Sequence, residues 1–351
     1  MQKKWMSCLF LLLISICACT LSTAAVVKDL ATADVRVDDR SQQALEAALP
    51  KALAQALVKI SGNENIATVP AIANQLQNAS QWMVGYSYKS QADGLLLSVN
   101  FNQDPLINLL RQTGQTIWGN DRPLTLVWYQ IVPYQQSSEL LVADSQYASN
   151  LQSSLADRGL VNMMPMGDLD DEALMTEQQA WPPKSAVLQS LRQRYGVEAI
   201  NMAQIREIAP GQWQGSEILA FNNNTYSWVL SAATVPAIIE NAVDNVADTM
   251  ANQLAILQSK GLRQTLQLRV LGVNDMATMQ YVMSYLQKLT AIDKLTLLGI
   301  GQNGLILNAE TAGGREQLRL ALARNRNLSL ENTIAASDNG AANTVVLQWR
   351  G

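Results

Sequence analysis

Residues 211–232 read GQWQGSEILAFNNNTYSWVLSA, a segment rich in aromatic side chains and amides. The polar run NNNT at 222–225 separates two apolar, β-branched or aromatic runs, which predicts a hairpin. A four-residue loop would put four large side chains on one face, and burial should select that register. The two pairs created by this loop are Phe221 with Tyr226 and Leu219 with Trp228. We therefore expect a hairpin that buries its aromatic face, rather than an exposed platform for sugars.

Helices predicted at 184–195 and 236–258 are the expected covers for this face. Trp213 is the exception, because it lies at the open end of the hairpin. There it would remain accessible, and we count it among the candidate partner-contact residues.

The surrounding region, 121–260, alternates strands with helices, which indicates a central α/β domain. A strand is predicted at 124–132, helices at about 145–158 and 184–195, and a strand at 197–205. The preceding region, 26–120, predicts a smaller α+β domain. Its expected elements are a strand around Val35 and Val37, a helix at 41–60, strands at 82–89 and 95–101, and a helix from Asp104.

The last region, 261–351, predicts the order β-α-β-β-α-β, a ferredoxin-like unit. Residues 299–304 read GIGQNG, which matches the glycine pattern of dinucleotide-binding loops. That function requires the pattern to open a helix, whereas here it falls between two predicted strands. We interpret it as a hairpin turn at Asn303-Gly304. A polar, Ala- and Gly-rich loop is expected at 331–342. The fold class is thus α/β (α+β) and multi-domain.

Residues 1–25 have the features of an export signal. Lys3 and Lys4 precede a short apolar run, and small residues follow it. Cleavage after Ala24 or Ala25 fits this pattern best and predicts a periplasmic protein. The alternative is lipoprotein processing at Cys19, which would anchor the chain to a membrane.

Composition excludes several kinds of chemistry. The chain has no histidine, and its three cysteines all precede residue 20. A Ser-His or Cys-His nucleophile is therefore impossible in the mature chain, and zinc or haem sites are disfavoured. Without Lys3 and Lys4, 23 basic and 29 acidic residues remain, a net charge of −6. An acidic chain without a basic cluster is a poor candidate for binding nucleic acid. We expect no cofactor and no disulfide.

An acidic run at 168–172 gathers four carboxylates, from Asp168, Asp170, Asp171 and Glu172. Its spacing does not fit a twelve-residue calcium loop. Acids at the start of a helix suit the helix dipole, which is the structural interpretation. A weak cation site or a partner contact is the alternative. Carboxylate pairs could also hydrolyse glycosides, but nothing singles out one pair, so we do not expect an enzyme.

Four segments resemble the bacterial family known as domain of unknown function 2066 (DUF2066). They are ALVKISGN at 56–63, IWGNDRPLTLVW at 117–128, DLDD at 168–171, and RYGVEA at 194–199 followed by Trp213. The resemblance implies a protein exported to the envelope of Gram-negative bacteria and no assigned activity. It supplies no catalytic residue.

Trp118 and Arg122 fall between the first and second predicted domains. Packing of Trp118 and pairing of Arg122 with an acid form the structural interpretation, and a partner surface near this joint is the alternative. We expect a non-catalytic periplasmic protein that binds another envelope protein. The second hypothesis is a binder of a small ligand or glycan, and the third is a carboxylate hydrolase.

Overall fold

In this computed structural model, the structure describes residues 29–350 apart from 92–93, 121, 178–180, 258–263, 290, 302–303, 312–313, 323–327 and 331–342. Several predictions concern residues outside the described set: the export signal at 1–25 with Cys19, the turn residue Asn303, and the loop at 331–342. No helix in the described ranges is both long enough and apolar enough to span a membrane.

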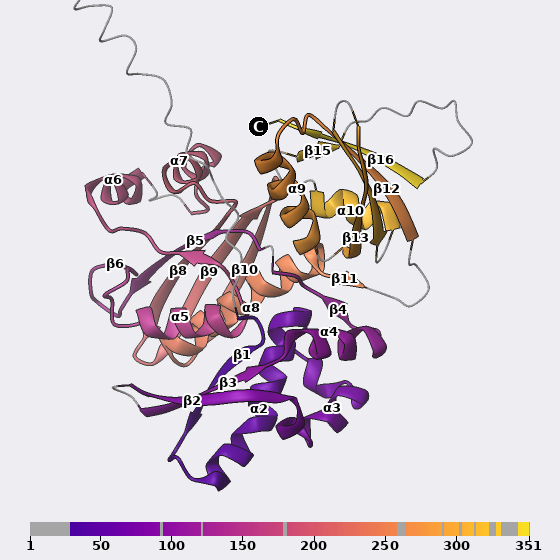
Figure 1. The fold of residues 1–351 in the computed structure, drawn as a ribbon. Helices are drawn as coiled ribbons and strands as arrows, with labels where there is room; N and C mark the ends of the chain where they lie inside the picture. The colour runs from indigo at the N-terminus through magenta and orange to yellow at the C-terminus, as the bar shows by residue number, and fades with distance from the viewer. Residues whose placement is uncertain are drawn as a thin grey trace, which may run out of the picture.

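The first unit packs three helices against a small antiparallel sheet of order β1-β3-β2 (Figure 1). The strands are β1 (Thr32–Val37), β2 (Met83–Gln91) and β3 (Gly94–Phe101); the helices are α2 (Gln42–Ser61), α3 (Pro70–Leu76) and α4 (Gln103–Gln112). Ser41 caps the start of α2 by accepting a hydrogen bond from the Ala44 amide. Gly62, at φ 74°, ends it in the left-handed conformation that glycine adopts readily.

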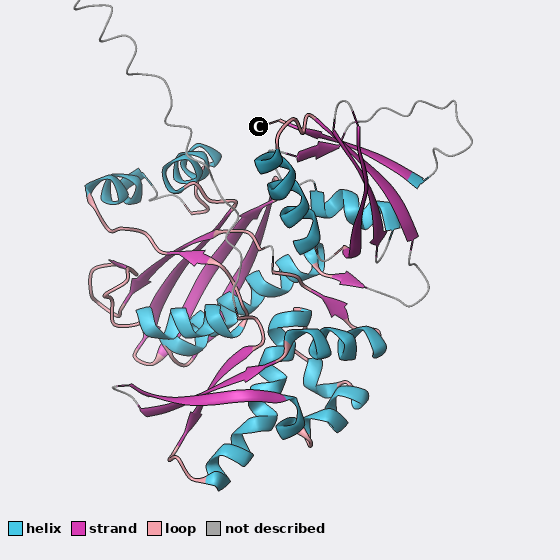
Figure 2. Ribbon diagram, in the orientation of Figure 1, coloured by secondary structure: helices cyan, strands magenta, loops and turns pink. Residues whose placement is uncertain are grey.

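The central unit is built on the sheet β10-β9-β8-β5-β6, with β7 also pairing with β5. Its strands are β5 (Thr125–Val132), β6 (Glu139–Leu140), β7 (Asn162–Met163), β8 (Ala199–Ala209), β9 (Gln212–Phe221) and β10 (Asn224–Ala232). Its helices are α5 (Ala148–Asp157), α6 (Leu169–Glu177), α7 (Ser185–Tyr195) and α8 (Val235–Leu254). Helices lie on both sides of this sheet, as the α/β prediction requires (Figure 2).

The hairpin that joins β9 to β10 has a two-residue turn, so the predicted four-residue loop is wrong. Asn222 and Asn223 have φ values of 49° and 61°, and Phe221 pairs with Asn224. A turn with two positive φ angles matches the right-handed twist of its strands, and asparagine tolerates that conformation. The register moves by two residues, so the same side chains still share one face. The actual pairs are Leu219 with Tyr226 and Glu217 with Trp228.

The expected covers of this hairpin are only half right. Helix α8 lies on the aromatic face together with α5, whereas α7 packs on the opposite face of the sheet. The reason is that β9 is apolar on both sides: Ile218 and Ala220 are buried under α7, and Leu219 and Phe221 under α8. A strand of this kind requires a helical layer on each face.

The third unit follows the predicted order up to its second helix and then has two strands instead of one, so it lacks the full ferredoxin-like topology. Its sheet order is β13-β14-β12-β16-β15, with α9 (Met276–Lys288) and α10 (Gly314–Leu322) packed against it. The strands are β12 (Gln264–Leu271), β13 (Ile292–Gly301), β14 (Gly304–Thr311), β15 (Leu328–Leu330) and β16 (Thr344–Trp349). A β-α-β-β-α-β unit would make the last strand antiparallel to the first, yet β16 is parallel to β12. The added strand β15 reverses the chain before β16, which accounts for the difference. The glycine pattern does join two strands, with Gly301 opposite Gly304.

Each of the three larger sheets has its own buried core, and the central sheet has one on each face. A two-stranded pairing of β4 (Thr116–Ile117) with β11 (Ile256–Leu257) lies where the three units meet (Figure 1). An ion pair of 2.8 Å between Arg111 on α4 and Asp293 on β13 also joins the first and third units. The domain boundaries at 120 and 260 stay a prediction.

Candidate functional site

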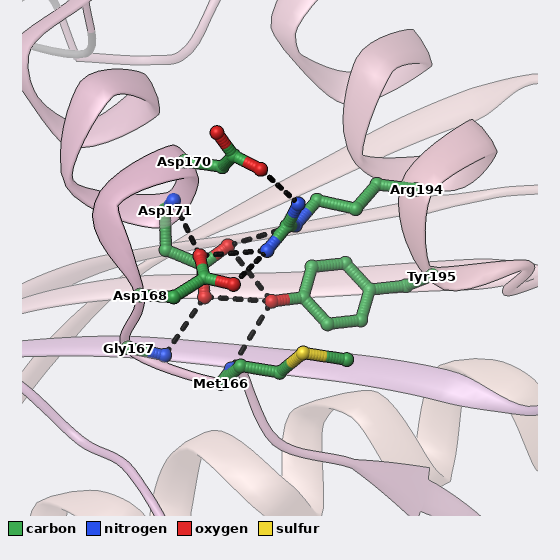
Figure 3. A network of polar contacts seen from close by, with 7 residues as sticks. All are labelled: Met166, Gly167, Asp168, Asp170, Asp171, Arg194 and Tyr195. Carbon is green, nitrogen blue, oxygen red and sulfur yellow. Dashed lines mark hydrogen bonds and ion pairs between the residues drawn. The ribbon is translucent and has the colours of Figure 1, made fainter.

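The acidic run at the start of α6 is fastened to the end of α7 (Figure 3). Asp171 is fully buried, and its carboxylate accepts hydrogen bonds from the Tyr195 hydroxyl at 2.8 and 2.7 Å and from the Gly167 amide at 2.8 Å. The Tyr195 hydroxyl in turn accepts from the Met166 amide at 3.1 Å. This small network fixes the backbone on the N-terminal side of α6.

Arg194 neutralises much of the charge in the run. Its guanidinium forms ion pairs with Asp168 at 2.5 Å, Asp170 at 2.9 Å and Asp171 at 3.2 Å. A hydrogen bond from the Asp171 amide and the pairing with Arg194 lower the pKa of Asp168. Burial and the hydrogen bond to Asp171 raise the pKa of Tyr195, so its hydroxyl keeps the proton that it donates. Because Arg194 already occupies the space between these carboxylates, the weak cation site is disfavoured.

The network supports two exposed apolar side chains. Met166 is 70% exposed and Leu169 is 81% exposed, although both are next to fixed backbone. Asp168 and Asp170 are their neighbours in sequence, and the exposed side chain of Asp170 points toward Arg194 (Figure 3). We call residues 166–171 the α6 corner. It combines a rigid backbone with apolar and acidic side chains that face water.

Trp118 and Arg122 are both buried and hold the joint between the first two units. Arg122 is stacked over the Trp118 ring, 3.8 Å from its centre. The guanidinium donates to five backbone carbonyls, and its pairing with an acid stays a prediction. The acceptors are Gly119 and Trp118 at 3.1 Å, Arg158 at 3.1 Å, Gly159 at 2.8 Å, and Lys59 at the end of α2. Burial leaves neither side chain on the accessible surface.

Arg158 is a second arginine at this joint. It pairs with Asp244 at 2.5 Å and with Asp248, both on α8, and lies 4.0 Å from Glu64 beyond the end of α2. The chain is close-packed here: a side chain at Gly62 would place Cβ 2.4 Å from the Ala251 side chain. Gly62 therefore serves both the left-handed helix end and the close contact with α8.

A buried carboxyl group lies under α8 in the central sheet. Glu217 is fully buried and accepts hydrogen bonds from the side-chain amides of Asn201 at 2.7 Å and Asn245 at 3.0 Å. The Tyr129 hydroxyl donates to the other end of the Asn201 amide at 2.6 Å. Burial raises the pKa of Glu217 to about 8, against the opposing effect of its two amide donors. The carboxyl group is therefore mostly protonated at neutral pH.

The predicted accessibility of Trp213 is wrong. Its side chain is 9% exposed and belongs to the core beneath α8, whereas Trp228 is only partly buried. The reason is that Trp213 pairs with Ala232, immediately before α8, so the helix covers the open end of the hairpin.

Trp213→Ala should lower the free energy of unfolding by about 3 kcal/mol, because it removes a large buried side chain and leaves a cavity. Trp228→Ala should have a smaller effect, since part of that ring is already in water. Urea unfolding of the two variants beside the unchanged protein measures both effects. An equal or larger loss in Trp228→Ala would contradict this order.

The sequence interpretation missed several of these residues. In the sequence, Arg194 and Tyr195 stand out only as part of the RYGVEA segment at 194–199. Arg158 stands out only as the last residue of the helix predicted at about 145–158. Nothing in the sequence marks Met166 and Leu169 as part of a binding surface, since exposed apolar residues are common. For Glu217 a signal was present: its position two residues before Leu219 puts it on the same buried face of the strand.

Comparison with known proteins covers only part of the chain. A family model matches residues 24–119. That family is described as a domain of unknown function, DUF8605. The resemblance to DUF2066 is wrong, because no model of that family matches. No curated protein matches. Among solved structures, lipoprotein GNA1162 from Neisseria meningitidis is 14% identical over 37% of this chain and 97% of its own, with a TM-score of 0.19. A likeness this weak carries no argument about fold or function.

Proposed function

We propose that the chain is a non-catalytic, exported envelope protein that binds another envelope protein through the α6 corner. The observation that carries the proposal is the exposure of Met166 and Leu169 on a backbone held by Asp171 and Tyr195. Export is supported by the charged and apolar pattern of residues 1–25.

The chemistry of the corner defines the partner. Burying an exposed apolar side chain of this size contributes roughly 1.5–3 kcal/mol, so Met166 and Leu169 together could anchor a complex. Asp168 and Asp170 flank them with negative charge, which favours a partner that has an apolar pocket with a basic rim. A backbone that is already ordered loses little entropy on binding, which favours affinity.

Site-specific crosslinking in living cells tests this proposal. A photoreactive amino acid at position 166 should capture a discrete protein partner. The matched control is the same amino acid at Met276, an exposed methionine on α9 of the third unit, which should not capture that partner.

Variants of the α6 corner then distinguish the loss of a partner contact from the loss of the folded structure. Leu169→Ser should abolish capture from position 166 and leave the melting temperature unchanged, because Leu169 is in water. Equal capture from positions 166 and 276, or undiminished capture in Leu169→Ser, would refute the role of the α6 corner.

A further inference from the structure

Strand β10 is an open edge of the central sheet. On one side it pairs with β9 in an unbroken register from Asn224 to Ala232. On the other side, no strand in the described ranges pairs with it. Apart from β9, the described element that packs substantially on β10 is α8, which lies on the face that carries Tyr226, Trp228 and Leu230. Among the described strands, none pairs with its outer backbone amides and carbonyls, as is typical of an edge strand.

The other long edge strands of the described chain carry features that discourage pairing. Strand β1 contains Asp34 and Arg36. Strand β2 contains Lys89 and has a register shift between Met83 and Gly85. Strand β13 contains two charged residues and two register shifts. Charges and bulges are the usual devices that protect a sheet edge.

Strand β10 has none of these devices. Its nine residues, NTYSWVLSA, include no charge and no proline, and the register has no shift. Val229 is 86% exposed on the face away from α8. On the α8 face, the stacked rings of Tyr226 and Trp228 are only partly buried. A regular, uncharged edge with exposed apolar side chains is suited to strand addition.

We propose that β10 pairs with β10 of a second copy of this chain, antiparallel and about a twofold axis normal to the sheet. Such an axis keeps α8 of both copies on the same face of one continuous sheet. Tyr226 and Trp228 then meet their counterparts across the junction, and Val229 is covered on the other face. The contact is self-complementary, as a twofold interface requires.

The side-chain pattern of β10 favours a second copy as occupant. An added strand should present large apolar groups toward α8, and small or apolar groups on the opposite face, where Val229 is exposed. Strand β10 has this pattern itself: Tyr226, Trp228 and Leu230 face α8, and Thr225, Ser227, Val229 and Ser231 lie on the opposite face. Because the strand has no charge, antiparallel pairing brings no like charges together. Aromatic pairs across strands add to the stability of the contact.

Val229→Lys tests the proposal without disturbing the fold, since this side chain is in water. The matched control is Val84→Lys, because Val84 is 71% exposed and lies at the register shift of the protected edge β2. Sedimentation of the purified protein over a wide range of concentration measures the dimer. The unchanged protein and Val84→Lys should dimerise alike, and Val229→Lys should weaken the dimer by about tenfold or more. A monomer at all concentrations, or equal effects of the two substitutions, would overturn the proposal.

Single cysteines locate the contact independently. With Cys8, Cys17 and Cys19 replaced by serine, the chain has no thiol. One cysteine introduced at position 225, 227 or 229 is then the only group that can form a disulfide between two copies. Oxidation should link two copies at the position nearest the axis, because a disulfide requires Cβ atoms about 4 Å apart. A cysteine at position 84 should not link. Dimers with no disulfide at any β10 position would place the interface elsewhere and refute the pairing.

Discussion

Arg122→Ala should lower the free energy of unfolding by about 3–5 kcal/mol, the effect expected when a buried charged partner is removed. The side chain is fully buried and donates to five carbonyls, three of which belong to Lys59, Arg158 and Gly159. Its loss leaves these acceptors without their donor and opens a cavity beside Trp118. Chemical unfolding monitored by tryptophan fluorescence measures the effect.

Two further variants separate the geometry of Arg122 from its charge. Arg122→Lys keeps the charge but lacks the planar fork of donors, so most of the loss should remain. Arg206 is an exposed arginine on β8, and Arg206→Ala should change stability by no more than about 0.5 kcal/mol. Full stability in Arg122→Lys would mean that charge alone, and not the set of carbonyl contacts, holds the joint.

Glu217→Gln should stabilise the protein at alkaline pH by an amount on the order of 5 kcal/mol. The pKa of Glu217 is raised to about 8 from an ordinary value of 4.5, because burial disfavours the carboxylate. Glutamine can occupy the same space without charge, and rotation of the Asn245 amide would let it accept a hydrogen bond from the new side chain. Thermal or urea unfolding across a pH series measures the difference.

The direction of the pH dependence follows from proton binding. Between pH 4.5 and 8 the folded protein holds the Glu217 proton and the unfolded chain has released it. The contribution of Glu217 to stability is therefore full below pH 4.5 and is lost as the pH rises to about 8. Asp157, whose pKa burial raises to about 6, acts in the same direction at lower pH. Between pH 6.5 and 8.5, Glu217 therefore contributes more to the slope of stability against pH than Asp157 does.

A matched variant guards against a general effect of removing negative charge. Glu139 on β6 is exposed, so Glu139→Gln should leave the slope of stability against pH unchanged. Glu217→Gln should flatten that slope between pH 6.5 and 8.5. If the two variants retain the same slope, the buried carboxyl group does not carry a raised pKa.

The sequence predicts elements here better than it predicts contacts. Alternation and turn residues locate β9 and β10 and the face they share, because those signals are local. They do not distinguish a two-residue turn at Asn222-Asn223 from a longer loop, since asparagine suits both. The burial of Trp213 depends on α8, which begins after β10 and returns across the hairpin. No local pattern reports that contact.

The α6 corner illustrates the same limit. The acids at the start of a helix follow from their preference for the helix dipole. Their partner Arg194 lies 23 residues beyond Asp171 and reaches it only because α6 and α7 are adjacent in the fold. At the joint, carbonyls of three separate segments converge on Arg122. Convergence of this kind depends on tertiary packing.

The joint between the first two units, formed around Arg122 and Arg158, also bears on whether the first unit can fold without the rest of the chain. The family match ends at residue 119, so it includes α2 and Trp118 but neither Arg122 nor Arg158. Those two arginines supply donors to the Lys59 and Gly62 carbonyls at the end of α2. The unit that the match delimits therefore depends on residues outside its own boundary, and a cut at residue 119 passes through a shared hydrogen-bonded core.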